Sequence, residues 1–240
     1  LADSWRAIGE PGKALEAVRD AWHNNSLERD VEREVLSTYG KQLTQDDHRA
    51  RVEYLLWTNQ RTAASKLKYL LTSDYRKLVD ARIALAARSR NVDALVDAVP
   101  ANLQDNPGLL YERAKWRRQK LRNQDVATPL LTGIDENDIP EAGRSRLWDE
   151  RNIAIRTDLK DGNWSRAYQL ASPHGMESGG DFAEAEWVSG WIALRLKNDA
   201  DRSLQHFETM SDGVSTPISL ARGKYWAGRA RDALGQPDAA

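Results

Sequence analysis

Residues 182–235 read FAEAEWVSGWIALRLKNDADRSLQHFETMSDGVSTPISLARGKYWAGRARDALG, and they carry the clearest helical pattern of the chain. Its apolar residues recur at steps of three and four, which is the pattern of amphipathic helices, and they predict three helices in succession. Asn198-Asp199 and Thr216-Pro217 lie between the three patterns, where they are suited to end one helix and cap the next. Gly235 follows the third pattern, at a position that favours a left-handed residue.

The order helix, short turn, helix is typical of helical repeat proteins. The tetratricopeptide pattern has an aromatic residue, a small residue and a phenylalanine at fixed offsets, and Trp187, Ser203 and Phe207 satisfy it. The next comparable aromatic, Tyr225, comes later than a regular repeat would place it, so the period is loose. We therefore expect an all-α superhelical solenoid of antiparallel helix pairs, built from irregular tetratricopeptide-like repeats.

The rest of the chain carries helical signals almost from end to end. Further helices are predicted at 13–22, 27–43, 45–57, 62–71, 75–88, 92–99, 109–121, 126–131, 146–159 and 164–171. Polar breaks at 133–143 and 172–181 predict loops, and no stretch has the alternating pattern of a strand. Because no shift in composition divides the chain, residues 1–240 are predicted to form a single α-superhelical domain.

The composition limits the classes of function. The chain has 240 residues, of which 40% are hydrophobic and 30% charged, as expected of a soluble, folded protein with much surface. A net charge of −1 argues against a general binder of nucleic acid or anionic membranes, and no apolar run is long enough for a transmembrane helix. The absence of Cys excludes disulfides, thiolate metal sites and Cys nucleophiles, but leaves the compartment open. The start, Leu-Ala-Asp-Ser, has no signal pattern and suggests a piece of a longer protein.

The residues that most often bind metals are poorly arranged for it. The four histidines, His23, His48, His174 and His206, lack metal-ligand spacing, so no metal or other cofactor is expected. We expect His48 and His206 to form hydrogen bonds between helices. The acidic stretch Asp135–Asp138 lacks the residue order of a calcium loop and predicts a solvated loop instead.

The basic run from Arg113 to Arg122 could bind an anionic polymer, with Trp116 as a stacking surface. A simpler interpretation is a helix whose buried side consists of Leu110, Ala114 and Leu121, with Lys and Arg on the solvated side. The sequence favours this second interpretation, in which the Lys and Arg side chains form a solvated face and no binding site.

Nine tryptophans are many for this length. Exposed indoles stack on sugars in carbohydrate-binding proteins, whereas indoles on an apolar stripe pack between helices. Packing is expected for the five that lie in phase with a stripe: Trp22, Trp57, Trp148, Trp187 and Trp191. A sugar platform would be sought first among the other four: Trp5, Trp116, Trp164 and Trp226.

Several strings go beyond the helical pattern. They include DHRAR at 47–51, LLW at 55–57, ARIAL at 81–85, Trp148 with ERN at 150–152, AEWVSGWIAL at 185–194, HF at 206–207, STPIS at 215–219 and YWAGRA at 225–230. From about residue 13 to its end, the chain resembles the superhelical domain of the soluble lytic transglycosylases, which cleave bacterial peptidoglycan. The resemblance implies a U-shaped or ring-forming α-superhelix in the periplasm, followed in the parent by a linker domain and a lysozyme-like catalytic domain.

The resemblance stops short of the active site. The family's catalytic motif begins Glu-Ser and is followed later by Gly-Leu-Met-Gln and Met-Pro. Glu177-Ser178 is followed by Gly-Gly-Asp, and neither Met176 nor Met210 lies in such a string. We therefore expect no catalytic residue in this chain, and the linker and catalytic domains are absent from it.

The favoured hypothesis is a non-catalytic helical scaffold of a peptidoglycan lytic transglycosylase. It would position the catalytic domain and the glycan strands, which are its expected partners, for cell-wall cleavage. The alternative is a stand-alone tetratricopeptide-like adaptor that binds proteins. A nucleic-acid-binding solenoid conflicts with the near-neutral charge.

Overall fold

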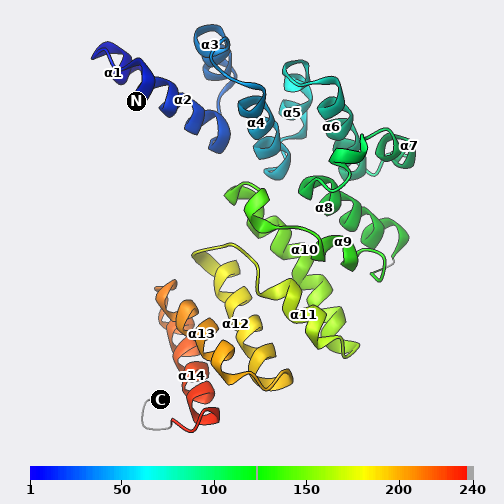
Figure 1. Ribbon diagram of the computed structural model, residues 1–240, viewed down its shortest axis with the longest axis vertical. Helices are drawn as coiled ribbons and strands as arrows, with labels where there is room; N and C mark the ends of the chain where they lie inside the picture. The colour runs from blue at the N-terminus through cyan, green and yellow to red at the C-terminus, as the bar shows by residue number, and fades with distance from the viewer. Residues whose placement is uncertain (123, 237–240) are drawn as a thin grey trace. The chain divides into compact units, whose positions relative to one another are not determined.

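The computed structural model describes residues 1–122 and 124–236, and the chain divides into two compact units, Leu1–Trp116 and Arg117–Ala240 (Figure 1). Within the described ranges the regular structure is helical throughout and contains no strand, which confirms the all-α prediction. Neighbouring helices pack in pairs in each unit. The repeat pattern, the superhelix and the single-domain organisation stay predictions.

The first unit consists of helices joined by short turns. Its elements are α1 (Ala2–Ala7), α2 (Pro11–Asn24), α3 (Arg29–Tyr39), α4 (Gln45–Trp57), α5 (Arg61–Leu67), a 3₁₀ turn (Lys68–Leu70), α6 (Ser73–Ala86), α7 (Val92–Asp97), a second 3₁₀ turn (Ala101–Leu103) and α8 (Pro107–Trp116). Helix α4 packs against α2, α5 and α8, while α6 packs against α7 and α8. The sequence did not predict α1, which buries none of its six residues and so carries no apolar stripe.

The second unit begins with a π-helical turn (Arg117–Leu121). It continues with α9 (Thr128–Thr132), a 3₁₀ turn (Glu136–Asp138), α10 (Glu141–Lys160), α11 (Trp164–Ala171), α12 (Gly179–Leu196), α13 (Ala200–Asp212) and α14 (Pro217–Ala233). Helix α10 packs against α11, α11 against α12, α12 against α13, and α13 against α14. Residues 141–143, predicted as loop, are helical because Pro140 with extended backbone precedes them and starts the helix.

Side-chain caps fix where several helices begin. The oxygen of each cap accepts a hydrogen bond from a backbone N–H of the first turn, which has no partner within the helix. The caps are Thr44 for α4, Thr72 for α6, Asp199 for α13 and Thr216 for α14. At Gly235, φ is +73°, so the predicted left-handed residue after α14 is confirmed.

The core of the first unit combines apolar side chains with a buried arginine. Trp22, Leu55 and Leu78 are fully buried, and so is the guanidinium of Arg51. Arg51 donates hydrogen bonds to the carbonyl oxygens of Trp22 (3.3 Å) and Asn25 (2.5 Å), and thereby ties α4 to the end of α2. The charge is matched by Glu32 of α3, whose carboxylate lies 3.2 Å away.

The pair α12–α13 approaches closely at a glycine. A Cβ atom added to Gly190 would lie 2.8 Å from the ring of Phe207, which is fully buried and has no room to move. Ser203, the small residue of the tetratricopeptide-like pattern, is also fully buried. Of the three positions in that pattern, Phe207 therefore lies at the tight contact, Ser203 is buried, and Trp187 packs half-buried against the cluster that contains Phe207.

We expect Gly190→Leu to lower the free energy of unfolding by about 1–3 kcal/mol, because the added side chain overpacks the ring of Phe207. Gly180, in the first turn of the same helix, has nothing within 4 Å of an added Cβ and provides the matched control. Urea unfolding of both variants checks this. A Gly190→Leu midpoint equal to that of Gly180→Leu would contradict the close approach.

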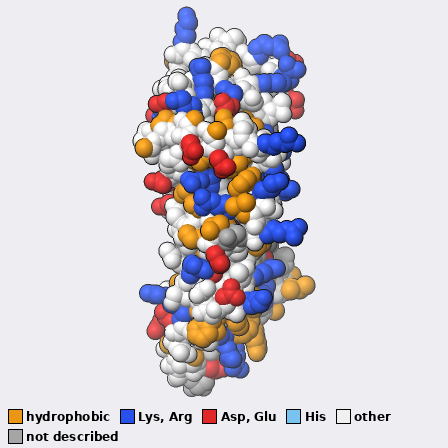
Figure 2. All heavy atoms as spheres, turned by 90° about the vertical axis from the view of Figure 1, so that its right-hand side faces the viewer, with side chains coloured by type: hydrophobic (Ala, Val, Ile, Leu, Met, Phe, Trp, Pro, Cys, Tyr) orange, Lys and Arg blue, Asp and Glu red, His pale blue; other side chains and the backbone are white. Residues whose placement is uncertain are grey.

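No described helix is both long and apolar enough to cross a membrane. The face shown in Figure 2 mixes Lys and Arg side chains with acidic and hydrophobic ones, as a net charge of −1 suggests.

Candidate functional site

Glu177 and Ser178 lie in the loop before α12, and both residues are exposed. Within the described ranges, the carboxylate of Glu177 has no hydrogen-bond or ion-pair partner. A general acid needs a position near the scissile bond, usually inside a shaped cleft. Glu177 lies on an exposed loop instead, and these surroundings do not favour it as the acid of a glycosidic cleavage.

The histidines have structural environments. His206 of α13 contacts the hydroxyl of Tyr168 (2.9 Å) and the carboxylate of Glu186, so its predicted inter-helix hydrogen bonds are confirmed. The same prediction for His48 is wrong: its buried Nδ1 has no hydrogen-bond partner in the described part of the chain, and the ring packs edge-on against Trp22 instead. In the described residues, no group of three or more His, Asp or Glu side chains could hold a metal ion.

Glu186 of α12 lies between two histidines, which the sequence analysis did not predict. One carboxylate oxygen is 3.1 Å from Nε2 of His174 and the other is 2.5 Å from Nδ1 of His206. Nδ1 of His174 in turn accepts a hydrogen bond from the backbone N–H of Met176 at 3.1 Å. Since both oxygens are occupied by ring nitrogens, this buried network ties the loop before α12 to α12 and α13.

The pKa of Glu186 is set by two opposed effects. Burial raises it, but the hydrogen bonds from His174 and His206 and the charges of these rings lower it more, so the net pKa lies below its ordinary value. A lowered folded-state pKa stabilises the fold above the unfolded pKa of about 4.3. This stabilisation is lost as the pH falls through the folded-state value.

We therefore expect Glu186→Gln to reduce the free energy of unfolding at pH 7 and to make a smaller difference at about pH 3, because the wild-type carboxyl takes up its proton as the pH falls through its lowered folded-state pKa. Chemical unfolding of both proteins at the two pH values measures this. Glu177→Gln is the control, because that exposed carboxylate has no partner in the described structure. An equal loss of stability at both pH values would contradict the assigned role of the charge.

The acidic stretch Asp135–Asp138 is only partly a solvated loop. The carboxylate of Glu136 is 14% exposed and lies 3.6 Å from the guanidinium of Arg151, which is itself buried. The pair was not predicted, because Glu136 lies in a 3₁₀ turn and Arg151 lies on α10, and only tertiary packing brings these two elements together.

The basic run also differs from its prediction. Helix α8 ends at Trp116, and residues 117–121 form a π-helical turn in place of a continuous helix. Leu121 is 54% exposed, so it does not belong to the predicted buried side. In this turn Arg118 makes two hydrogen bonds of 2.7 Å to the buried carboxylate of Glu150, so it is committed to a structural pair.

The tryptophans divide largely as predicted. Trp22, Trp57 and Trp148 are fully buried, whereas Trp187 and Trp191 are half-buried. Among the four platform candidates, Trp5 lies under the ammonium group of Lys13 and Trp116 packs against the core of the first unit. Trp164 is 45% exposed, and Trp226 lines a pocket.

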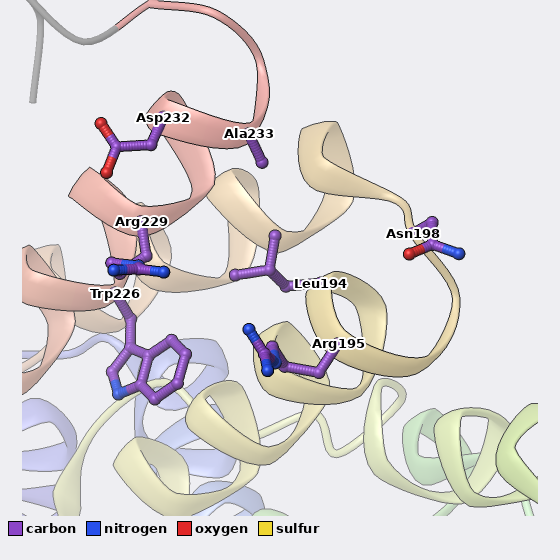
Figure 3. Close-up of a pocket in the computed structure, with 7 residues that line it drawn as sticks. All are labelled: Leu194, Arg195, Asn198, Trp226, Arg229, Asp232 and Ala233. Carbon is purple, nitrogen blue, oxygen red and sulfur yellow. The ribbon is translucent and has the colours of Figure 1, made fainter.

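The Trp226 pocket has a volume of about 410 Å³ and lies between the C-terminal halves of α12 and α14. Its lining residues are Leu194, Arg195, Asn198, Trp226, Arg229, Asp232 and Ala233. Figure 3 shows the guanidinium of Arg195 extending toward the indole of Trp226, with that of Arg229 beside the same indole. In the part of the chain that the structure describes, neither guanidinium has an ion-pair partner.

The indole of Trp226 is held by its neighbours. It stacks on the buried ring of Phe207 at 5.9 Å between centroids, and Trp187 meets it edge-on at 6.3 Å. These contacts fix the ring before any ligand arrives, which lowers the entropic cost of binding. The pocket thus presents a positioned indole next to two guanidinium groups, and this combination can stack on an apolar ring face and bind carboxylates.

Trp226 was expected from the sequence as a platform candidate, whereas the two arginines were not. Arg229 could have been found, because it follows Trp226 by three residues on one helix and so shares its face. Arg195 had no such signal. It reaches the pocket because α12 and α14 run the same way, with α13 between them in the chain.

In comparisons with known proteins, no family model, curated protein or solved structure matches the chain at a significant level.

Proposed function

We propose that this chain is a non-catalytic helical scaffold that contacts peptidoglycan glycan strands in the periplasm, as part of a lytic transglycosylase. The Trp226 pocket is the observation that carries this proposal. A glycan strand offers sugar rings with apolar faces and peptide stems with carboxylates. The indole of Trp226 is suited to the first, and the guanidinium groups of Arg195 and Arg229 are suited to the second.

The strings that suggested the resemblance support the proposal in a second way. Arg51, Arg82 and Arg151 belong to them, and all three side chains are buried. Glu186 and His206 belong to them as well, and form a partly buried hydrogen bond between α12 and α13. The shared residues are therefore those that hold helices together, as a scaffold requires.

Binding to purified peptidoglycan sacculi tests the proposal. The wild-type chain should sediment with sacculi, and Trp226→Ala should weaken the association about tenfold, an effect typical of losing a central aromatic contact. Because Trp226 also packs on Phe207, the double variant Arg195→Ala/Arg229→Ala gives a second reading that leaves the ring contacts in place. Trp164→Ala removes an exposed indole outside the pocket and is the control.

Wild-type affinity of both pocket variants would overturn the assignment of the site, and a wild-type chain that fails to bind would overturn the function. The chain alone should release no anhydro-muropeptides from the same sacculi. Release that is lost in Glu177→Gln would show that the active site has been misplaced.

The alternative function, a tetratricopeptide-like adaptor for proteins, is favoured by the tight contact of Gly190 with Phe207 and by the burial of Ser203. Ser203 and Phe207 lie at positions of the repeat pattern, which protein-binding adaptors share. The sacculus assay separates the two functions, because an adaptor would show no affinity for glycan.

A further inference from the structure

A second hollow lies in the first unit, far along the sequence from Trp226. This α3–α5 groove has a volume of about 440 Å³, and its walls come from α3 and α5. Helix α4 contributes Arg51 and Leu55 to its floor. The remaining lining residues are Leu27, Arg29, Glu32, Arg33, Leu36, Gln60, Thr62, Ala63, Lys66, Leu67 and Tyr69.

The groove concentrates positive charge in a chain whose net charge is −1. Four cationic side chains line it and only one carboxylate does, that of Glu32. Glu32 is already paired with the buried Arg51 at 3.2 Å. Arg29 and Lys66 are exposed, and among the described residues neither has an ion-pair partner.

Arg33, the remaining cation, pairs with Asp30 at 3.4 Å, but both side chains are largely exposed. Such surface pairs contribute little and exchange readily for another carboxylate. The two walls thus hold three cations that are available to a ligand: two on α3 and Lys66 on α5.

Apart from Arg51, which is paired with Glu32, the floor between these walls is apolar and firmly held. Leu55 and Leu67 belong to the core of the unit, and Leu27, Leu36 and Ala63 pack against that core while remaining half-buried. A groove with an apolar floor and charged walls is suited to an aliphatic side chain with carboxylates on either side.

We propose that the α3–α5 groove binds a short acidic peptide segment, with an aliphatic side chain on the floor and flanking carboxylates at Arg29, Arg33 and Lys66. Gln60 and Thr62 support a peptide over a fatty acid. Within the described part of the chain, the amide oxygen of Gln60 and the hydroxyl of Thr62 make no hydrogen bond, so both can bind peptide backbone groups. This site is independent of the Trp226 pocket and of the function proposed for it.

Calorimetric titration with defined peptides tests the inference. The probe is acetyl-Glu-Leu-Glu-Leu-Glu-amide, which should bind with one-to-one stoichiometry and more weakly as salt is added. Two matched peptides separate the contributions: Gln in place of each Glu removes the carboxylates, and Ser in place of each Leu removes the aliphatic side chains. Both should bind at least about tenfold more weakly, since each lacks one half of the recognised chemistry.

Variants of the chain assign the binding to the groove. Arg29→Glu and Lys66→Glu should each weaken binding of the probe about tenfold. Lys41 is an exposed lysine outside the groove, so Lys41→Glu should leave the affinity unchanged. Far-ultraviolet circular dichroism shows whether each variant stays folded. No heat with the probe, equal binding of the Gln peptide, or wild-type affinity in Arg29→Glu and Lys66→Glu would each overturn the inference. Binding of dodecanoate but not of the peptide would overturn it in favour of a fatty-acid site.

Discussion

Replacing Arg151 with Met should lower the free energy of unfolding by about 3–5 kcal/mol, the range observed when one partner of a buried ion pair is removed. The side chain of Arg151 is only 2% exposed. Its guanidinium donates to the carbonyl oxygens of Ile134 (2.6 Å), Leu131 (3.4 Å) and Pro173. It therefore ties α10 to the turn after α9 and to the loop before α12.

The cost arises because Met replaces the aliphatic part of the Arg side chain but has none of its donors. Three carbonyl groups would lose their partner, and Glu136 would lose its counter-charge. Burial lowers the pKa of Arg151, although the charge of Glu136 opposes this, so the native site tolerates the cation only with its partners in place.

Arg156→Met is the matched control on the same helix. Arg156 is 72% exposed and pairs with Glu184 at 3.3 Å, and such surface pairs contribute about 0–1 kcal/mol. Urea unfolding followed by circular dichroism compares the two variants. If Arg151→Met lost no more stability than Arg156→Met, the role given to the buried guanidinium would be wrong.

Glu53→Ala is the second substitution for which we expect a large effect, about 3–5 kcal/mol, this time in the first unit. The carboxylate of Glu53 accepts hydrogen bonds from the hydroxyl of Tyr75 (2.6 Å), from Arg82 (2.5 Å) and from the amide of Asn106 (3.4 Å). Arg82 is 2% exposed, and its Nε already lacks a partner within the described ranges. Without Glu53 a buried cation would remain without its counter-charge.

Two neighbouring residues prevent the site from compensating for the lost carboxylate. Burial, together with the charge and hydrogen bond of Glu53, strongly raises the pKa of Tyr75, so its hydroxyl remains a neutral donor and cannot replace the carboxylate. A Cβ atom on Gly108 would lie 2.0 Å from the guanidinium carbon of Arg82, so the cation rests on backbone and cannot shift in that direction.

The isosteric change Glu53→Gln keeps the shape and removes the charge, so its loss of stability should fall between those of wild type and Glu53→Ala. Glu16→Ala, an exposed glutamate on α2 without a described partner, should be close to neutral. Thermal and urea unfolding of the three variants rank their losses of stability. A Glu53→Ala value similar to that of Glu16→Ala would show that Arg82 does not depend on this carboxylate.

The elements that local patterns encode could be predicted from the sequence. Helices α4 and α11 have the predicted bounds, and Asp199 and Thr216 cap helices where they were predicted to do so. Helical periodicity, capping and the left-handed Gly235 each depend on a few neighbouring residues, and a linear sequence displays them directly. The in-phase tryptophans were recognised as packing residues for the same reason.

The pairing of polar groups, by contrast, follows from how the helices pack. Glu186 meets His174 and His206, Arg151 meets Glu136, and Arg118 meets Glu150. The Trp226 pocket likewise needed Arg195 from another helix. A helix pattern states which face is buried but not which neighbour covers it, because that depends on the loops and on the close approach of one helix to the next. The charges inside this fold therefore find their partners through packing, which the spacing of residues along the chain does not record.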